Sequence, residues 1–281
     1  MITHTKRSVP LKTCVDPQIR YIQRLHAREE RNRTGLLYIE GMRFVAQAVQ
    51  HQARIEHLVV CRELLTHPYA QRLVQQQKQR GIPLIEVSCQ VMERLSQVED
   101  SQGLGAVVRQ RWQRLASIKP RGELCWVMVE TIRSPGNLGT ILRASDAVGG
   151  AGLVLLGEST DPYDPRTVRA TMGALFSQYF VRTSVEELKH WPRRSQYMLV
   201  GTSPGAAHDY QEIQYRQPTI LLMGEERKGL PAELQALCDI MVRIPMVGES
   251  DSLNVAMATS VMLYEVFNQQ RKRRENFPVQ S

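Results

Sequence analysis

Short apolar runs alternate with segments of helical periodicity through the second half of the chain, and this alternation most restricts the folds open to it. We expect strands at Leu124–Val129, Leu153–Leu156, Tyr179–Arg182, Met198–Gly201, Ile220–Met223 and Met241–Ile244. Helices are expected at Leu138–Val148, Arg166–Leu175, Val185–Trp191 and Ala232–Cys238, with a last helix from about Ser252 to about Arg273. Strands that are apolar throughout are typical of a parallel sheet with helices on both faces. The second half is therefore predicted to be such an α/β domain.

The first half repeats the alternation on a smaller scale. Helices are expected at Pro17–Arg33, Glu40–Gln50, Tyr69–Arg80 and Gln90–Leu95, and strands at Leu36–Ile39, Leu58–Cys61, Leu84–Val87 and Leu104–Arg109. This order predicts a separate, small α/β domain. We divide the chain into a basic arm (1–17), this small domain (18–111), a basic linker containing Pro and Gly (112–122), the larger domain (123–274) and a tail (275–281).

The net charge of +8 favours an anionic partner, most often nucleic acid. Basic residues gather in 1–35 and at Arg271–Arg274. The same clusters could form a solvated helix face and a tail, and net charge does not distinguish RNA from DNA.

Composition narrows the class of protein further. Hydrophobic residues make up 42% and charged residues 23%, as in a soluble globular protein, and no apolar run is long enough to span a bilayer. The N-terminus has no apolar core of a signal peptide, although its basic character leaves a transit signal open. No two of the five cysteines have CxxC spacing, so neither a zinc site nor a disulfide framework is indicated, which fits a cytoplasmic protein.

Polar residues follow three of the expected strands. Ligands of parallel α/β sheets bind beyond the carboxyl ends of strands. Asn137 follows the Pro-Gly turn after the first strand and is expected to cap a helix that carries Arg143. Gly224 and Gly229 frame four charged residues, and Ser252–Asn254 precede the last helix. Each feature also has a structural interpretation, as a helix cap, a solvated turn or a surface arginine; there is no GxGxxG or Walker motif.

The three stretches SPGNLGTILRASDAVG, LLMGEERKGL and IPMVGESDSLNVAMA resemble, in order and spacing, the three motifs of the SpoU/TrmH-type RNA ribose methyltransferases of the SPOUT superfamily. The resemblance covers about residues 124–270. In the first half, GLLYIEGMRFVAQAV and VEDSQGLGAVV are similar to the small substrate-binding domain that precedes many of these enzymes.

The resemblance implies a homodimer that transfers the methyl group of S-adenosylmethionine to a ribose 2′-OH of RNA, more often rRNA than tRNA. It also implies a C-terminal trefoil knot and no metal. The implied catalytic residues are Asn137, Arg143, Glu226, Ser252 and Asn254. The cofactor is expected against Thr202, Leu222, Gly224, Ile244, Met246 and Leu253. Arg169 and the N-terminal Arg28, Arg31, Arg33 and Arg43 are expected to contact RNA.

The second motif departs from the family pattern at two positions, because Glu225 stands where Asn or a small residue is usual and Arg227 follows Glu226 where glycine is common. Either Glu225 or Glu226 could then be the functional acid, and we favour Glu226. Two other functions remain open, namely an inactive RNA-binding protein of the same fold and a methyltransferase acting on tRNA, either at a ribose 2′-OH or at a base or ring nitrogen. The complete set of motif residues argues against the first, and the Ser-Leu-Asn motif favours ribose over a base.

Overall fold

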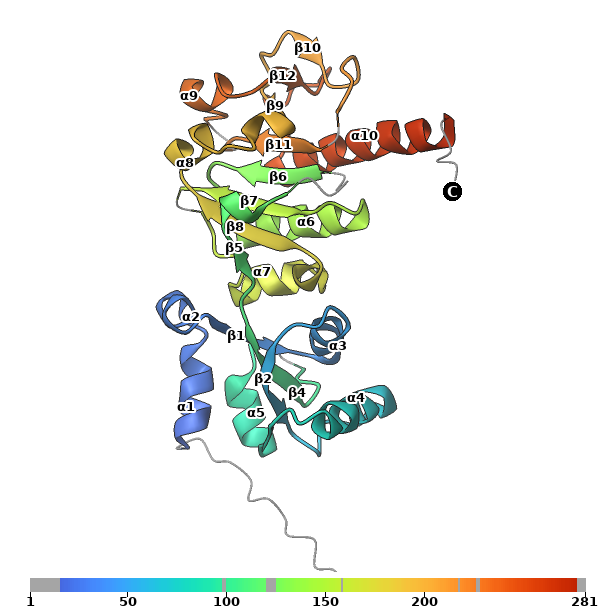
Figure 1. Cartoon of the computed structure of the whole chain (residues 1–281). Coiled ribbons are helices and arrows are strands. Elements are labelled where there is room, and N and C mark those ends of the chain that lie inside the picture. The colour runs from blue at the N-terminus through green and yellow to red at the C-terminus, as the bar shows by residue number, and fades with distance from the viewer. Residues whose placement is uncertain are drawn as a thin grey trace, which may run out of the picture. The chain divides into compact units, whose positions relative to one another are not determined.

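The computed structural model describes residues 16–97, 100–119, 125–157, 159–216, 218–225 and 228–276. The chain forms two compact units (Figure 1). The first ends at Gln110 and includes Tyr163–Pro165, and the second comprises Arg111–Pro162 and the chain from Arg166 onward. Within the described ranges, no helix is both long enough and apolar enough to cross a membrane.

The first unit contains a four-stranded mixed sheet of order β1-β4-β2-β3. Its elements are α1 (Pro17–Arg24), α2 (Arg28–Thr34), β1 (Leu36–Glu40), α3 (Met42–Gln50), β2 (Ile55–Val60), α4 (Pro68–Gln79), β3 (Leu84–Glu86), α5 (Cys89–Leu95) and β4 (Leu104–Arg109). Strand β4 runs antiparallel to both β1 and β2, whereas β2 and β3 are parallel. The loops that leave β2 and β3 therefore emerge at the same edge of the sheet.

The second unit contains an eight-stranded sheet of order β10-β12-β9-β11-β6-β7-β8-β5 in which every pair is parallel. Its strands are β5 (Trp112–Gln113), β6 (Cys125–Val129), β7 (Gly152–Leu156), β8 (Tyr179–Thr183), β9 (Met198–Thr202), β10 (His208–Asp209), β11 (Thr219–Met223) and β12 (Ile240–Arg243). Its helices are η1 (Leu115–Ser117), α6 (Pro135–Ala147), α7 (Pro165–Ala170), η2 (Ala174–Phe176), α8 (Val185–Lys189), η3 (Arg194–Gln196), α9 (Ala232–Gln235) and α10 (Val255–Asn276). The predicted parallel α/β domain is confirmed; the trefoil knot stays a prediction.

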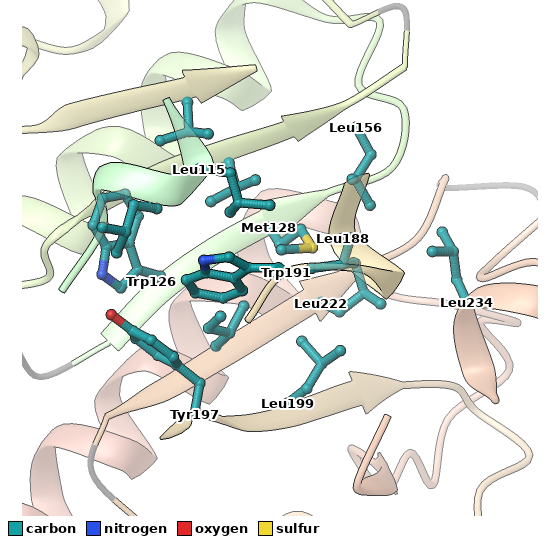
Figure 2. Close-up of a cluster of buried hydrophobic side chains, with 14 of the residues drawn as sticks. Leu115, Trp126, Met128, Leu156, Leu188, Trp191, Tyr197, Leu199, Leu222 and Leu234 are labelled. Atoms are coloured by element: carbon teal, nitrogen blue, oxygen red, sulfur yellow. The ribbon is translucent and has the colours of Figure 1, made fainter. Parts of the chain in front are cut away.

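Helices cover both faces of this sheet, which is why its central strands are apolar throughout. Strands β6, β7 and β11 are buried at every residue. On one face, side chains of β6, β9 and β11 pack with residues of α8 and α9, and Figure 2 shows Trp191 lying among Trp126, Met128 and Leu222. On the other face lie α6 and α10, which pack against each other (Figure 1).

The expected helix over Pro17–Arg33 is two helices, because the chain turns at Leu25–Ala27. Arg31 stabilises this turn. Its guanidinium donates to the carbonyl oxygens of Leu25 and His26 at 3.0 and 2.6 Å, and the residue is only 1% exposed. The expected contact between Arg31 and RNA is therefore wrong, since this arginine satisfies the last carbonyl groups around a helix end.

Trp112–Gln113, which we placed in a linker, forms strand β5 and pairs with β8 at the edge of the larger sheet. A two-residue strand next to a proline- and glycine-containing stretch has no periodicity that would reveal it. The expected helix over Arg166–Leu175 is also interrupted, because Met172 and Gly173 have φ values of 54° and 102°. The last helix begins at Val255 rather than near Ser252.

Candidate functional site

A cavity of about 520 Å3 lies where β9, β11 and β12 end. These strands are neighbours in the sheet, and because all three are parallel their carboxyl ends lie at one edge. Five of the six residues expected to bind the cofactor line this cavity, namely Thr202, Gly224, Ile244, Met246 and Leu253. Its volume lies in the range of about 300–1,000 Å3 that small-molecule sites usually have.

The sixth expected residue, Leu222, lies elsewhere. It is 0% exposed, and its side chain packs in the core of the opposite face beside Trp191 (Figure 2). Successive side chains of a strand point to opposite faces, so the neighbouring Met223 lines the cavity instead. Leu222 is therefore part of the strand that leads to the cavity, but its side chain does not line the cavity.

The loop after β11 approaches itself so closely that it requires glycine. A Cβ atom on Gly224 would lie 2.3 Å from the carbonyl carbon of Gly229, and Gly229 itself has a φ of 66°. The Gly229 N–H donates to the Glu225 carbonyl oxygen at 2.8 Å and closes the turn. The cavity wall at Gly224 is therefore bare backbone, the kind of surface that lets a ligand approach closely. Glu226, the predicted acid, lies outside the described residues.

Glu225 and Arg133 join two of the three motif loops. Glu225 lines the cavity, and its Oε1 atom lies 3.1 Å from the Nε atom of Arg133 in the loop after β6. Glu225 is a departure from the family pattern, whereas no role was predicted for Arg133. No local pattern could have paired them, because they are 92 positions apart.

Asn254 joins the third motif to the first. Its Oδ1 atom accepts from the N–H groups of Ala256 and Met257 at 2.9 and 3.3 Å, which makes it the N-cap of α10. Its Nδ2 group donates to Asn137 Oδ1 at 3.2 Å. The cap thus fixes the amide orientation of Asn254, and the Asn137 NH2 group points away from it.

Ser134, not Asn137, caps α6. The Asn137 N–H donates to Ser134 Oγ at 3.3 Å, with Pro135 at the first helical position. The prediction that Asn137 is the cap is therefore wrong: it is the third residue of the helix, three positions after the cap. Its side chain is thereby available to reach Asn254.

Arg143 lies on α6 with its side chain exposed. Among the residues that the structure describes, its guanidinium has no hydrogen-bond or ion-pair partner. A permanent positive charge without a protein partner suits the binding of an external anion. Arg169, at the end of α7, is half-buried and engaged within the protein. Ser252 is exposed and lines the cavity beside Leu253.

The N-terminal arginines differ from one another in their surroundings. Arg28 and Arg43 are exposed. Arg33 is also exposed but pairs with Glu30, with its Nε and Nη2 atoms donating at 3.0 and 2.6 Å. That pairing raises the pKa of Arg33, so its charge is already balanced within α2. Most of the expected basic arm lies outside the described residues.

Comparison with known proteins identifies the class to which this fold and site belong. The SpoU rRNA Methylase family matches residues 125–264, and the MRM3-like substrate binding domain matches residues 16–106. The chain is 34% identical over 248 residues to the 23S rRNA (uridine(2479)-2′-O)-methyltransferase of Streptomyces viridochromogenes, covering 86% of each chain. It is 24% identical over 256 residues to the 23S rRNA (guanosine(2553)-2′-O)-methyltransferase of Bacillus subtilis strain 168, covering 91% of this chain and 98% of that one.

A solved structure is similar over nearly the whole length. The AdoMet-bound rRNA methyltransferase from Sinorhizobium meliloti is 33% identical, with a TM-score of 0.83 over 95% of this chain and 97% of that one. The chain belongs to the SpoU rRNA methylase family, as its three motifs predicted.

Proposed function

We propose that this protein transfers the methyl group of S-adenosylmethionine to a ribose 2′-OH of large-subunit rRNA. The observation that carries the proposal is the meeting of all three family motifs at one edge of the parallel sheet. The second and third motifs line one cavity, and the bond between Asn137 and Asn254 brings the first motif next to it. The relatives named above act on 23S rRNA, which supports this class of substrate.

The cavity suits S-adenosylmethionine, which supplies a methyl group on a cationic sulfur. Gly224 offers backbone without a side chain, while Ile244, Met246 and Leu253 offer apolar surface for an adenine ring. Charged groups of both signs, Glu225, Asp251 and Lys228, also line the cavity. The amino acid part of the cofactor carries both an ammonium and a carboxylate, so such a mixed lining suits it.

Arg143 and the asparagine pair would act on the ribose. A 2′-OH is a poor nucleophile until it loses its proton, so the site must orient it and stabilise the developing negative charge. The planar guanidinium fork of Arg143 can hold a phosphate next to the ribose. The bond from Asn254 to Asn137 holds the two amide groups together at the start of α6 and α10, where they can position the ribose.

Transcriptome-wide mapping of 2′-O-methylation in strains with and without the gene would test the proposal. One ribose in large-subunit rRNA should lose its methyl group in the deletion strain and regain it on complementation. Loss of methylation only in tRNA would contradict the rRNA assignment. If no ribose changes while purified protein still binds RNA, the chain is an RNA-binding member of the family without methyltransferase activity.

We also propose that two copies pair through α10. Met257 and Tyr264 on this helix are 59% and 52% exposed, and they lie seven residues apart and so on one face. Leu253, 38% exposed, precedes the same helix. Exposed apolar side chains that share a helix face are typical of a surface that another chain covers.

A further inference from the structure

Two cysteines and a glutamate meet in the first unit, whereas the methyl-transfer site lies in the second. Cys61 is the first residue after β2, Glu63 lies in the following turn, and Cys89 begins α5, three residues after β3 ends. The Cys61 and Cys89 sulfur atoms are 3.4 Å apart, and the Cys89 thiol donates to Glu63 Oε2 at 2.6 Å. The three donor atoms lie within 4.8 Å of one another.

The sheet explains why they meet. Strands β2 and β3 are parallel neighbours, so the loops that follow them leave at one edge. Gly103 holds the first loop in place: it has a φ of 68°, and a Cβ atom there would lie 2.7 Å from the Cys61 carbonyl oxygen. The Cys61 N–H also donates to the Gly103 carbonyl oxygen at 2.9 Å. Cys61 is therefore part of a tightly packed backbone and not of a mobile loop.

The charges around the cluster leave Glu63 available to a cation. The neighbouring Arg62 pairs with Glu86 at 2.5 Å. Over the part of the chain that the structure describes, Glu63 has no basic partner within ion-pair distance. Three electron-rich atoms thus share one small site, in which Cys89 interacts with both Cys61 and Glu63.

We propose that Cys61, Glu63 and Cys89 bind a thiophilic divalent cation, Zn2+ in the first instance, with water as the fourth ligand. Zinc at about 2.3 Å from each sulfur in a tetrahedral site holds two thiolates about 3.8 Å apart. The observed separation of 3.4 Å needs only a small adjustment. The exposed Glu63 carboxylate would move back by about 1 Å to reach a tetrahedral position.

A disulfide between the same cysteines would require a larger change. Bonded sulfur atoms lie about 2.05 Å apart, so the two thiols would have to come more than 1 Å closer than the 3.4 Å observed. Gly103 packs directly against the Cys61 backbone and opposes any backbone contribution to that movement. A bound cation would instead join the two loops with little displacement and stabilise the first unit.

The test is titration of the reduced full-length protein with Co2+ and with Zn2+. We expect one equivalent of Co2+ to give a thiolate-to-metal charge-transfer band that Zn2+ abolishes, together with a rise in Tm. Cys89→Ser, at a partly exposed position, should abolish the band, and Glu63→Gln should weaken binding at least tenfold. Cys238→Ser, which changes a half-buried cysteine of the other unit, and Cys14→Ser should leave the band unchanged.

Several outcomes would overturn the site. One is the absence of the band in the wild-type protein, and another is its persistence in Cys89→Ser. Affinity of Glu63→Gln within threefold of wild type would remove the third ligand and with it the proposed geometry. Isolation of a Cys61–Cys89 disulfide peptide from non-reduced protein would show that these thiols form a redox pair instead.

Discussion

At the scale of single residues, Arg143 is the group through which the protein is expected to act on RNA. Its side chain is exposed and without a protein partner among the described residues, whereas the cofactor cavity is lined from other loops. It should therefore contribute to the reaction more than to cofactor binding or to the fold.

Arg143→Ala should lower the single-turnover rate of methyl transfer by about 10²–10⁴-fold, because it removes a group that positions the nucleophile and eases its proton loss. S-adenosylhomocysteine affinity, measured by isothermal titration, should stay within twofold of wild type. Arg143→Lys should recover little, since an ammonium does not reproduce a planar guanidinium fork. A rate for the alanine variant within threefold of wild type would show that Arg143 is a structural surface residue.

Asn254 has two roles that a pair of substitutions can separate. Aspartate caps a helix as well as asparagine does, whereas alanine costs about 1 kcal/mol. Asn254→Asp should therefore keep wild-type thermal stability, but it loses the Nδ2 donor and forces the Asn137 amide to reverse. We expect slower methyl transfer in the Asp variant, and both slower transfer and a lower Tm in Asn254→Ala. Wild-type turnover of Asn254→Asp would mean that Asn254 is a helix cap and nothing more.

At the scale of elements, α6 is placed by the helices on either side of it. It carries Asn137 and Arg143, it packs against α10, and its side chains Leu138, Ile141 and Leu142 are each 0% exposed. It also approaches α7 closely at Gly139, where a Cβ atom would lie 2.3 Å from Ala170 Cβ and 2.9 Å from the Thr167 carbonyl oxygen. The position of this helix is thus fixed by packing as well as by its cap.

Gly139→Ala should destabilise the protein even though alanine is the better helix former. The propensity gain is about 1 kcal/mol, whereas overpacking typically costs about 1–3 kcal/mol, and the main contacts here are a neighbouring Cβ atom and backbone that cannot rotate away. Gly136→Ala on the same helix is the control, because a Cβ atom there meets only Ser134 Oγ at 3.7 Å. Thermal unfolding should give a lower Tm for Gly139→Ala and an equal or higher one for Gly136→Ala. The reverse order would show that α6 and α7 can separate.

At the scale of the whole molecule, the outstanding question is assembly. The exposed apolar residues of α10 predict a dimer, and light scattering should give twice the chain mass of 32.1 kDa at micromolar concentration. Tyr264→Glu should weaken the dimer at least tenfold, because it would place a charge in a desolvated contact. Tyr69→Glu, at a tyrosine 45% exposed on α4, should not change the dimer. A wild-type mass of one chain would refute the pairing.

Much of this architecture could be predicted from local patterns alone. A strand buried on both faces must be apolar throughout, and β6, β7 and β11 show this in their sequences. The glycines at 224 and 229 and the three motif loops could be recognised for the same reason: each depends on backbone conformation or side-chain type within a few residues. The family assignment followed from those motifs and is confirmed.

Contacts between distant segments were decided only by the tertiary structure. Asn137 and Asn254 are 117 positions apart in the sequence, and Cys61 and Cys89 are 28 positions apart. The members of each pair meet because the order of strands in their sheet brings their loops to one edge. The pairing of Trp112–Gln113 with β8 and the burial of Arg31 have the same origin. Local sequence fixes which face of an element is apolar, but strand order decides which loops share an edge. The methyl-transfer site and the cysteine cluster both form at such edges, where chain topology brings separate segments together.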